Sequence, residues 1–279
     1  MDALARRMVP DALWDIAEPL IPKFAARRQG GGTAPVDDRA VLVAIVFVLT
    51  SGCAWRQLPS SFGVSVPTAH RRFCAWADAG FFDRLHREVL DRLGAGGEVN
   101  WSAAIVDSAS VRAKKGSLTG RNPVDRGKAG SKIHVLSDAN GLPLVTAVTG
   151  ANVHDSVMLR PLVTAIPAIR SRRGPRRRRP ERLRADKGYD YRVHRHWLHC
   201  RRIIPRIARR GIDDSARLGR HRWKIERTFA WLIGYRRLAI RYERHGHLFA
   251  AFVDLATALI CYKKLPHETS SYRCQNSIG

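Results

Sequence analysis

Helical periodicity dominates the first ninety residues of the chain. Apolar residues over 13–20 recur at i, i+3, i+4 and i+7, which predicts a short amphipathic helix. A second apolar stripe over 41–49 predicts another helix, with Asp37 or Asp38 as its N-cap and Gly52 as its end. This part of the chain is therefore expected to be all-helical.

A third helix is expected over 68–79, after a turn at 58–63. Ser65 can cap this helix and Gly80 can end it. A helix, a tight turn and a second helix match the helix-turn-helix pattern of DNA-binding proteins. The apolar face of the third helix leaves four side chains free for DNA: Thr68, His70, Arg71 and Arg72.

The periodicity changes from residue 99 onward. Short apolar runs predict strands over 103–111, 132–136, 142–148, 183–186 and 201–208. Helices are expected over 156–166, 191–199, 218–235 and 248–262. This order predicts an α/β fold, a mixed sheet flanked by helices and preceded by a small all-α domain that resembles a helix-turn-helix.

We therefore expect three parts. Residues 1–98 form the helical domain that resembles a helix-turn-helix, residues 99–265 form the α/β domain, and residues 266–279 form a flexible polar tail.

Charge distinguishes the two expected domains. The chain of 279 residues carries 49 Lys plus Arg against 24 Asp plus Glu, a net charge of +25. Residues 1–98 hold 12 basic and 11 acidic side chains, whereas residues 99–279 hold 37 and 13. The excess belongs to the second domain and predicts a polyanionic partner, DNA above all. Arginine outnumbers lysine by 40 to 9, which suits phosphate binding but equally fits the codon bias of a GC-rich genome.

Other classes of protein are less compatible with this sequence. The apolar runs 41–49 and 248–262 are too short to span a bilayer, so no membrane association is expected. Five scattered cysteines form no disulfide framework. We expect a cytoplasmic protein that associates with the nucleoid.

Three acids stand out in the basic domain. Asp107 lies within an apolar strand, Asp186 ends another strand, and Glu226 lies in a late helix. On that helix Glu226 is predicted to share the buried face with Trp223 and Ile233. Carboxylates that converge repel one another unless cations hold them, and oxygen ligands suit Mg²⁺ or Mn²⁺. The alternative is that each acid pairs separately with a nearby Lys or Arg.

Two basic segments flank the strands that carry these aspartates. The segment 169–184 holds nine Arg and one Glu, and the segment 112–132 holds seven basic residues and one acid. A charge run is usually a solvated surface. Because each run adjoins a strand with an aspartate, we expect both to lie beside the site.

Several stretches of the sequence, taken together and in order, resemble one family. They are Ile105-Val-Asp-Ser-Ala-Ser-Val-Arg, Gly130-Ser-Lys-Ile-His, Ala151-Asn-Val-His-Asp-Ser, Ala185-Asp-Lys-Gly-Tyr-Asp and Arg222-Trp-Lys-Ile-Glu-Arg-Thr-Phe-Ala-Trp. The chain is similar to the DDE transposases of bacterial insertion sequences, whose glutamate lies in a Tyr-Arg-Glu-Lys signature, and to insertion-sequence family five among them. The resemblance covers residues 10–265 and implies a ribonuclease H-like catalytic core.

The resemblance also implies roles for individual residues. Asp107, Asp186 and Glu226 would be the catalytic metal ligands for two Mg²⁺ or Mn²⁺ ions, and Arg222 the signature arginine. The signature tyrosine and lysine are replaced by Gly219 and Ile233. We therefore expect lysine and arginine side chains of the second domain to bind the DNA: Lys114, Lys115, Lys132, Lys187, Arg222, Arg236 and Arg237.

The function implied is that of a DNA transposase. It would bind the terminal inverted repeats of its element, cleave at the ends and transfer the 3′-hydroxyl strands to target DNA, acting as a homodimer or larger assembly on DNA. Two alternatives remain open: a ribonuclease H-like nuclease without strand transfer, and a catalytically decayed DNA-binding repressor.

Overall fold

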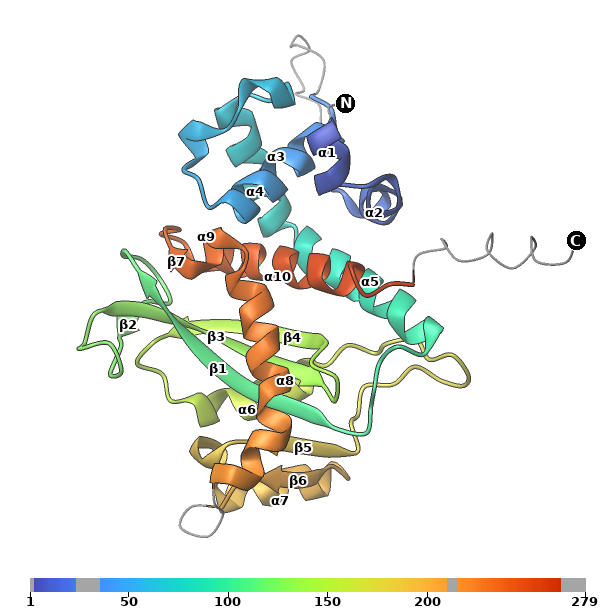
Figure 1. Ribbon diagram of the computed structural model, residues 1–279, viewed down its shortest axis with the longest axis vertical. Coiled ribbons are helices and arrows are strands. Elements are labelled where there is room, and N and C mark those ends of the chain that lie inside the picture. The colour runs from blue at the N-terminus through green and yellow to red at the C-terminus, as the bar shows by residue number, and fades with distance from the viewer. Residues whose placement is uncertain (1–2, 24–35, 210–214, 267–279) are drawn as a thin grey trace, which may run out of the picture.

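A computed structural model describes residues 3–23, 36–209 and 215–266, and the side chains of residues 215–222 lie outside it (Figure 1). The expected tail falls almost wholly outside the described residues. Among the helices of the described chain, none has the length and apolar character needed to cross a membrane.

The N-terminal region is helical, as predicted. Asp37 caps helix α3 (Asp38–Ser51), because its side chain accepts hydrogen bonds from the backbone N–H groups of Arg39 and Ala40. Gly52 ends that helix in a left-handed conformation. Ser65 caps the fourth helix through the N–H of Thr68. The elements are α1 (Ala3–Met8), α2 (Asp11–Ala17), η1 (Glu18–Leu20), α3 (Asp38–Ser51), η2 (Trp55–Gln57), η3 (Ser60–Phe62), α4 (Val66–Asp78) and α5 (Phe81–Gly96).

The predicted tight turn between α3 and α4 is wrong. The connection runs from Gly52 to Ser65 and contains the two short 3₁₀ turns η2 and η3. A helix-turn-helix motif joins its helices with three or four residues. At the start of this connection the backbone of Gly52 lies against α9, where a Cβ at residue 52 would approach Arg236 to within 2.8 Å.

The second part of the chain forms one mixed sheet. Its central order is β4-β3-β1-β5-β6: the pairs β1–β3 and β3–β4 are antiparallel, and β1–β5 and β5–β6 are parallel. Three antiparallel strands followed by two parallel strands are the ribonuclease H-like arrangement, which confirms the predicted fold class. The strands are β1 (Ala104–Ala113), β2 (Gly120–Arg121), β3 (Ala129–Asp138), β4 (Pro143–Gly150), β5 (Arg182–Ala185), β6 (Ile204–Ile207) and β7 (Ile240–Arg241).

Helices flank this sheet. In Figure 1, α8 crosses in front of β1, and α10 lies between the sheet and the N-terminal helices. Helix α6 packs against β3 and β4, and α7 packs against β6. The elements are η4 (Asp155–Met158), α6 (Leu159–Ala165), η5 (Lys187–Tyr189), α7 (Arg192–Cys200), α8 (Ser215–Ile233), α9 (Arg236–Ala239) and α10 (Gly246–Tyr262).

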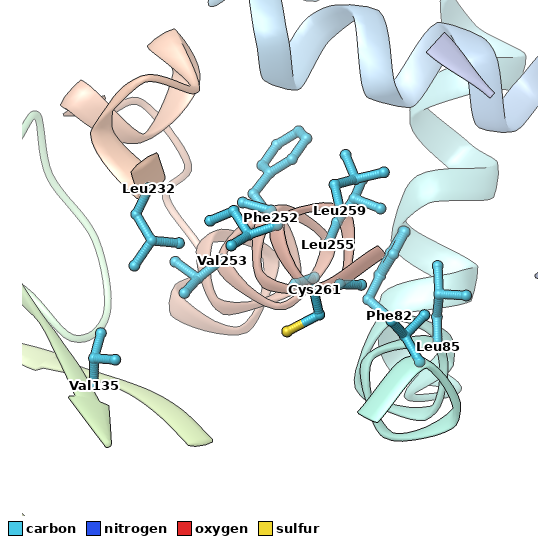
Figure 2. Packing of buried hydrophobic residues seen from close by; sticks show 14 of the residues in the cluster. Phe82, Leu85, Val135, Leu232, Phe252, Val253, Leu255, Leu259 and Cys261 are labelled. Carbon is cyan, nitrogen blue, oxygen red and sulfur yellow. The ribbon is translucent and has the colours of Figure 1, made fainter. Parts of the chain in front are cut away.

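Helix α10 is the centre of the hydrophobic core. It is apolar around nearly its whole circumference, as expected of a helix that is buried on all sides. Figure 2 shows Phe82 and Leu85 of α5 on one side of it, and Leu232 of α8 and Val135 of β3 on the other. The N-terminal helices and the sheet therefore share one core, and a domain boundary at residue 98 stays a prediction.

A buried ion pair of the second region also makes a hydrogen bond to the first. Arg237 of α9 pairs with Glu243 at 2.7 Å and donates a hydrogen bond to the backbone oxygen of Cys53 at 2.8 Å. Both charged side chains are almost fully buried. Breaking such a pair leaves an uncompensated buried charge, so this contact holds α9 firmly against the N-terminal helices.

Candidate active site

Asp107 lies on β1, and Asp186 directly follows the neighbouring parallel strand β5. The last printed pair of these strands is Ile105–Arg184, and each acid comes two residues beyond it, at the same end of the two strands. Each carboxylate accepts a local backbone hydrogen bond at 2.8 Å, Asp107 from Ser108 and Asp186 from Gly188. The sheet therefore brings the first two predicted acids together.

Strand alternation shows which face of the sheet carries Asp107. Asp107 pairs with Val135 of β3, and in Figure 2 Val135 points toward Leu232 of α8. Because residues paired across antiparallel strands point to the same face, Asp107 lies on the face that α8 covers. This is the face from which Glu226 would have to approach.

Tyr189 is a buried tyrosine close enough to Asp107, Asp155 and Asp186 to feel their negative charges. Only 1% of this residue is exposed, and its hydroxyl has no hydrogen-bond partner within the described part of the chain. Burial raises the pKa of Tyr189 far above its usual value, and the charges of Asp107, Asp155 and Asp186 raise it further. A buried hydroxyl normally has a partner, so this orphan donor marks a polar site.

Asp155 belongs to the same polar cluster but does not cap the short helix η4. His154 takes that role, because its Nδ1 accepts the backbone N–H of Ser156. Asp155 instead pairs with Lys132 at 2.9 Å. Burial alone would raise the pKa of Asp155, but hydrogen bonds from Lys132 and Ser108 outweigh it, so the pKa lies below its usual value.

Glu226 lies on α8, but the prediction that it shares a buried face is wrong. Trp223 is 49% exposed, Ile233 is 42% exposed, and Glu226 between them is exposed as well. A competing stripe at the same helical spacing takes the buried face, and its members are Ile225, Thr228, Phe229 and Leu232. This stripe wins because it packs against β1, β3 and α10.

The described residues contain no group of three or more Asp, Glu, His or Cys close enough to hold a metal ion. The adjacent pair Asp107 and Asp186 nevertheless fits a hard divalent cation, because it offers carboxylate oxygens beside the partnerless hydroxyl of Tyr189. Glu226 does not complete the ligand set in this conformation.

Comparison with known proteins gives the family. Residues 102–261, more than half of the chain, match the family described as "Transposase DDE domain", and residues 9–86 match "Putative transposase of IS4/5 family". The chain belongs to the DDE transposases of insertion sequences. Membership in this family implies the use of divalent metal ions.

Individual relatives agree with this assignment. The transposase is 49% identical over 147 residues to a "Putative transposase for insertion sequence element IS402" of Burkholderia cepacia, a match that spans 53% of this chain and 70% of the relative. It is 42% identical over 123 residues to an "Insertion element IS402 uncharacterized 16.2 kDa protein" of the same organism, with 43% of this chain and 84% of that protein covered.

Solved structures show a more distant likeness. The Mos1 transposase paired-end complex with left transposon end aligns with a TM-score of 0.26 and 12% identity, over 86% of the transposase and 81% of that chain. The Mos1 strand transfer complex aligns with a TM-score of 0.27 and 10% identity, over 88% and 82%. Likeness at this level carries no inference about this transposase.

Three of the basic side chains predicted to contact DNA form ion pairs within the transposase. Arg72 is buried and pairs with Asp38, Lys132 is held by Asp155, and Arg237 pairs with Glu243. Each of these side chains is thus held by an acid of the same chain, and the DNA contacts expected of them stay predictions.

The remaining candidates keep their accessible positions. His70, Arg71, Lys114, Lys115 and Arg236 are exposed. Thr68 and Lys187 are half-buried, and Thr68 accepts a hydrogen bond from the Ser65 hydroxyl. The Arg222 side chain lies outside the described residues. The DNA contacts of these seven residues and of Arg222 stay predictions.

The expectation that both basic segments adjoin the site stays a prediction. The segment 112–132 begins at the end of β1, five residues beyond Asp107. The arginine-rich segment 169–184 leads into β5 at its first residue, whereas Asp186 follows the last. Strand direction thus places most of this segment at the far end of β5.

Sequence reasoning overlooked the cluster around Asp155. Lys132 and His134 alternate on β3, opposite Ser110 and Ser108 of β1, so these four polar residues share one face. Polar residues at every second position of an otherwise apolar strand are the signal that would have revealed the cluster in the transposase.

Proposed function

We propose that this transposase binds the terminal inverted repeats of its element, cleaves at the ends and joins the 3′-hydroxyl strands to target DNA. The observation that carries this proposal is that β1 and β5 bring Asp107 and Asp186 to the same end of the sheet, in a chain of the DDE family. The net charge of +25 supports DNA as the substrate.

The candidate catalytic residues are Asp107, Asp186 and Glu226. Two carboxylates on adjacent strands repel each other, so a divalent cation between them would stabilise the pair. Glu226 would join them as the third ligand from α8, the helix that covers this face of the sheet. Two bound Mg²⁺ or Mn²⁺ ions would supply Lewis-acid stabilisation of the attacking and leaving oxygens.

Residues of the chain orient this site. The Lys132–Asp155 pair holds Ser108, and the backbone N–H of Ser108 donates to Asp107. These contacts restrict the Asp107 carboxylate, much as outer-sphere partners restrict metal ligands in other proteins.

Cleavage and joining are both in-line displacements at phosphorus. The attacking group is a water in the first step and the 3′-hydroxyl of the element in the second, so one site serves both. No covalent bond between protein and DNA is required. Because two element ends must be brought together, we expect a homodimer or larger assembly on DNA.

The test uses the full-length protein and labelled DNA ends taken from the sequence that flanks its gene. With Mg²⁺ or Mn²⁺ we expect end cleavage followed by joining to a target duplex, and neither with Asp107→Ala. Cleavage that survives this substitution would refute the assignment of Asp107. Cleavage without joining would instead identify a ribonuclease H-like nuclease.

One observation favours a second candidate, a catalytically decayed DNA-binding repressor. Glu226 is exposed, and the signature tyrosine and lysine around it are replaced by Gly219 and Ile233. A repressor would bind the element ends with wild-type affinity, yet would show no cleavage at any concentration of Mg²⁺ or Mn²⁺.

A further inference from the structure

A loop of seven arginines projects from the transposase between α6 and β5. Residues 170–179, here named the arginine loop, contain no acidic residue, and all seven of the arginines are exposed. In Figure 1 this segment lies at the right edge, beside the C-terminal end of α5, whereas β2 lies at the left edge.

Asp91 of α5 fastens the arginine loop. Its carboxylate accepts the backbone N–H of Arg170 at 3.0 Å and the Arg176 guanidinium at 2.7 Å. The same nitrogen of Arg176 donates to the backbone oxygen of Ala168 at 2.6 Å. A single acid thus anchors both the beginning and the middle of the loop.

The backbone of the loop is fixed as well. Ile169 and Arg177 form an isolated antiparallel bridge with two hydrogen bonds of 2.8 Å. Inside this bridge the Ser171 hydroxyl lies within hydrogen-bond distance of the backbone oxygens of residues 173–175. The loop therefore has a defined shape, although its seven like charges favour an extended one.

Gly94 explains how the loop lies so close to α5. A Cβ at this position would approach the backbone oxygen of Arg170 to within 2.1 Å, so only glycine allows the contact. Ile169 and Pro180, at the two ends of the loop, are buried. The fold thus holds a concentrated positive charge against a helix.

Most of this charge has no partner within the described part of the chain. Asp91 is paired with Arg170 and Arg176, and Arg177 lies over the Trp101 ring. Arg173, Arg178 and Arg179 form no ion pair with any described acid. Exposed guanidinium groups in a fixed array suit the phosphates of a nucleic acid, which they can bind in bidentate fashion.

The position of the loop separates it from the catalytic acids. Pro180 and Glu181 lead into β5, whereas Asp186 follows the end of that strand. A strand of this length spans roughly 13 Å. The arginine loop therefore cannot contact the phosphate that is cleaved at Asp186, but it can contact the same duplex, or another one, several base pairs away.

We propose that the arginine loop is a second, sequence-independent binding site for the phosphate backbone of duplex DNA, separate from the catalytic site. This proposal rests on the proposed function in that the transposase acts on DNA, but it requires neither metal nor cleavage. The duplex is either the body of the element end or the target, and both present the same phosphate chemistry.

The test measures DNA affinity as a function of salt, without divalent metal, for an element end and for an unrelated duplex of equal length. For Arg178→Gln/Arg179→Gln we expect the slope of log K against log salt to become shallower by about two, since each lost phosphate contact removes roughly 0.9. The matched control is Arg201→Gln/Arg202→Gln at the end of α7, which removes two exposed charges outside the loop and outside the residues expected to contact DNA.

The outcomes separate the possibilities. Three results together support the proposal. The slope of log K against log salt becomes shallower for both duplexes in the Gln variant, stays at the wild-type value in Arg178→Lys/Arg179→Lys, and is unchanged in the control. A change confined to the element end or to the unrelated duplex would overturn sequence-independent binding and assign the loop to that duplex alone. A wild-type slope in the Gln variant, or the same loss in the control, would overturn the proposal. Failure of the proposed function would appear separately, as absent cleavage with intact binding.

Discussion

The two halves of the candidate site are built in different ways. Asp107 and Asp186 are placed by the hydrogen-bonded register of β1 and β5, and both accept backbone hydrogen bonds. Glu226 lies on the exposed face of α8, two turns below the exposed Ile233. The sheet thus fixes the positions of the first two acids, whereas α8 leaves the third acid on its exposed face.

The largest expected effect tests the sheet half. We predict that Asp186→Asn lowers end cleavage by about 10³-fold or more, because it removes a carboxylate that would hold the divalent cations that stabilise the transition state. Rates are compared in single-turnover assays at saturating Mg²⁺. The control Asp83→Asn alters an exposed acid of α5 that pairs with Arg87 and should cleave at the wild-type rate. Equal losses in both variants would contradict the assignment.

The helix half should be weaker and rescuable. We expect Glu226→Gln to lower cleavage by about 10²-fold at low Mg²⁺ and to recover in part as Mg²⁺ or Mn²⁺ is raised, because an exposed carboxylate contributes to metal affinity more than to the fold. Its free energy of unfolding should stay within about 0.5 kcal/mol of wild type. Glu88→Gln on α5 is the control for an exposed Glu. A large loss of stability would show that Glu226 is structural.

A smaller effect is expected from the residues behind the sheet acids. Asp155→Asn weakens the contact with Lys132, so we predict a loss of cleavage of about tenfold and a higher Mg²⁺ requirement. Because Asp155 is about one-third exposed, the loss of stability should be near 1 kcal/mol. Asp125→Asn, which alters the pair with Arg112, should change neither quantity. A shift in metal requirement distinguishes positioning from mere destabilisation.

The smallest effect concerns the pH dependence of stability near the sheet acids. Burial lowers the pKa of His134 to about 4, from an ordinary value near 6.5. The unfolded chain therefore binds more protons between these values, and the stability that neutral His134 contributes is lost as pH falls from about 6.5 to 4.

His134→Gln keeps a partner for Thr149 and removes this titration. We expect the slope of unfolding free energy against pH to decrease by up to about 1.4 kcal/mol per unit in this range. The exposed His70→Gln is the control. An unchanged slope in His134→Gln would show that His134 is protonated in the folded state.

Much of the sheet could be predicted from sequence. Continuous apolar runs located β1 and β5, because local chemistry determines these elements. Helix caps at Asp37 and Ser65 were equally local and equally predictable.

The orientation of α8 could not be predicted in this way. Both stripes of the helix have helical spacing, one through Trp223 and Ile233 and the other through Ile225 and Leu232. Which stripe is buried depends on the surfaces offered by β3 and α10, distant in sequence. Ion pairs such as Arg72 with Asp38 are likewise tertiary contacts, because they join residues that are far apart in the sequence.

The contact of Gly52 with α9, with the bond from Arg237 to Cys53, has a consequence for how an element end is measured. Helices α3 and α4 are joined to the sheet by packed side chains and not by a tether. If these helices read the repeat, the interval between the sequence that is read and the bond that is cut is a fixed length of protein. One inserted base pair lengthens the DNA by roughly 3.4 Å, so the cut would move along the strand by one nucleotide instead of following the sequence. The transposase would then select the cleaved bond by its distance from the recognised sequence.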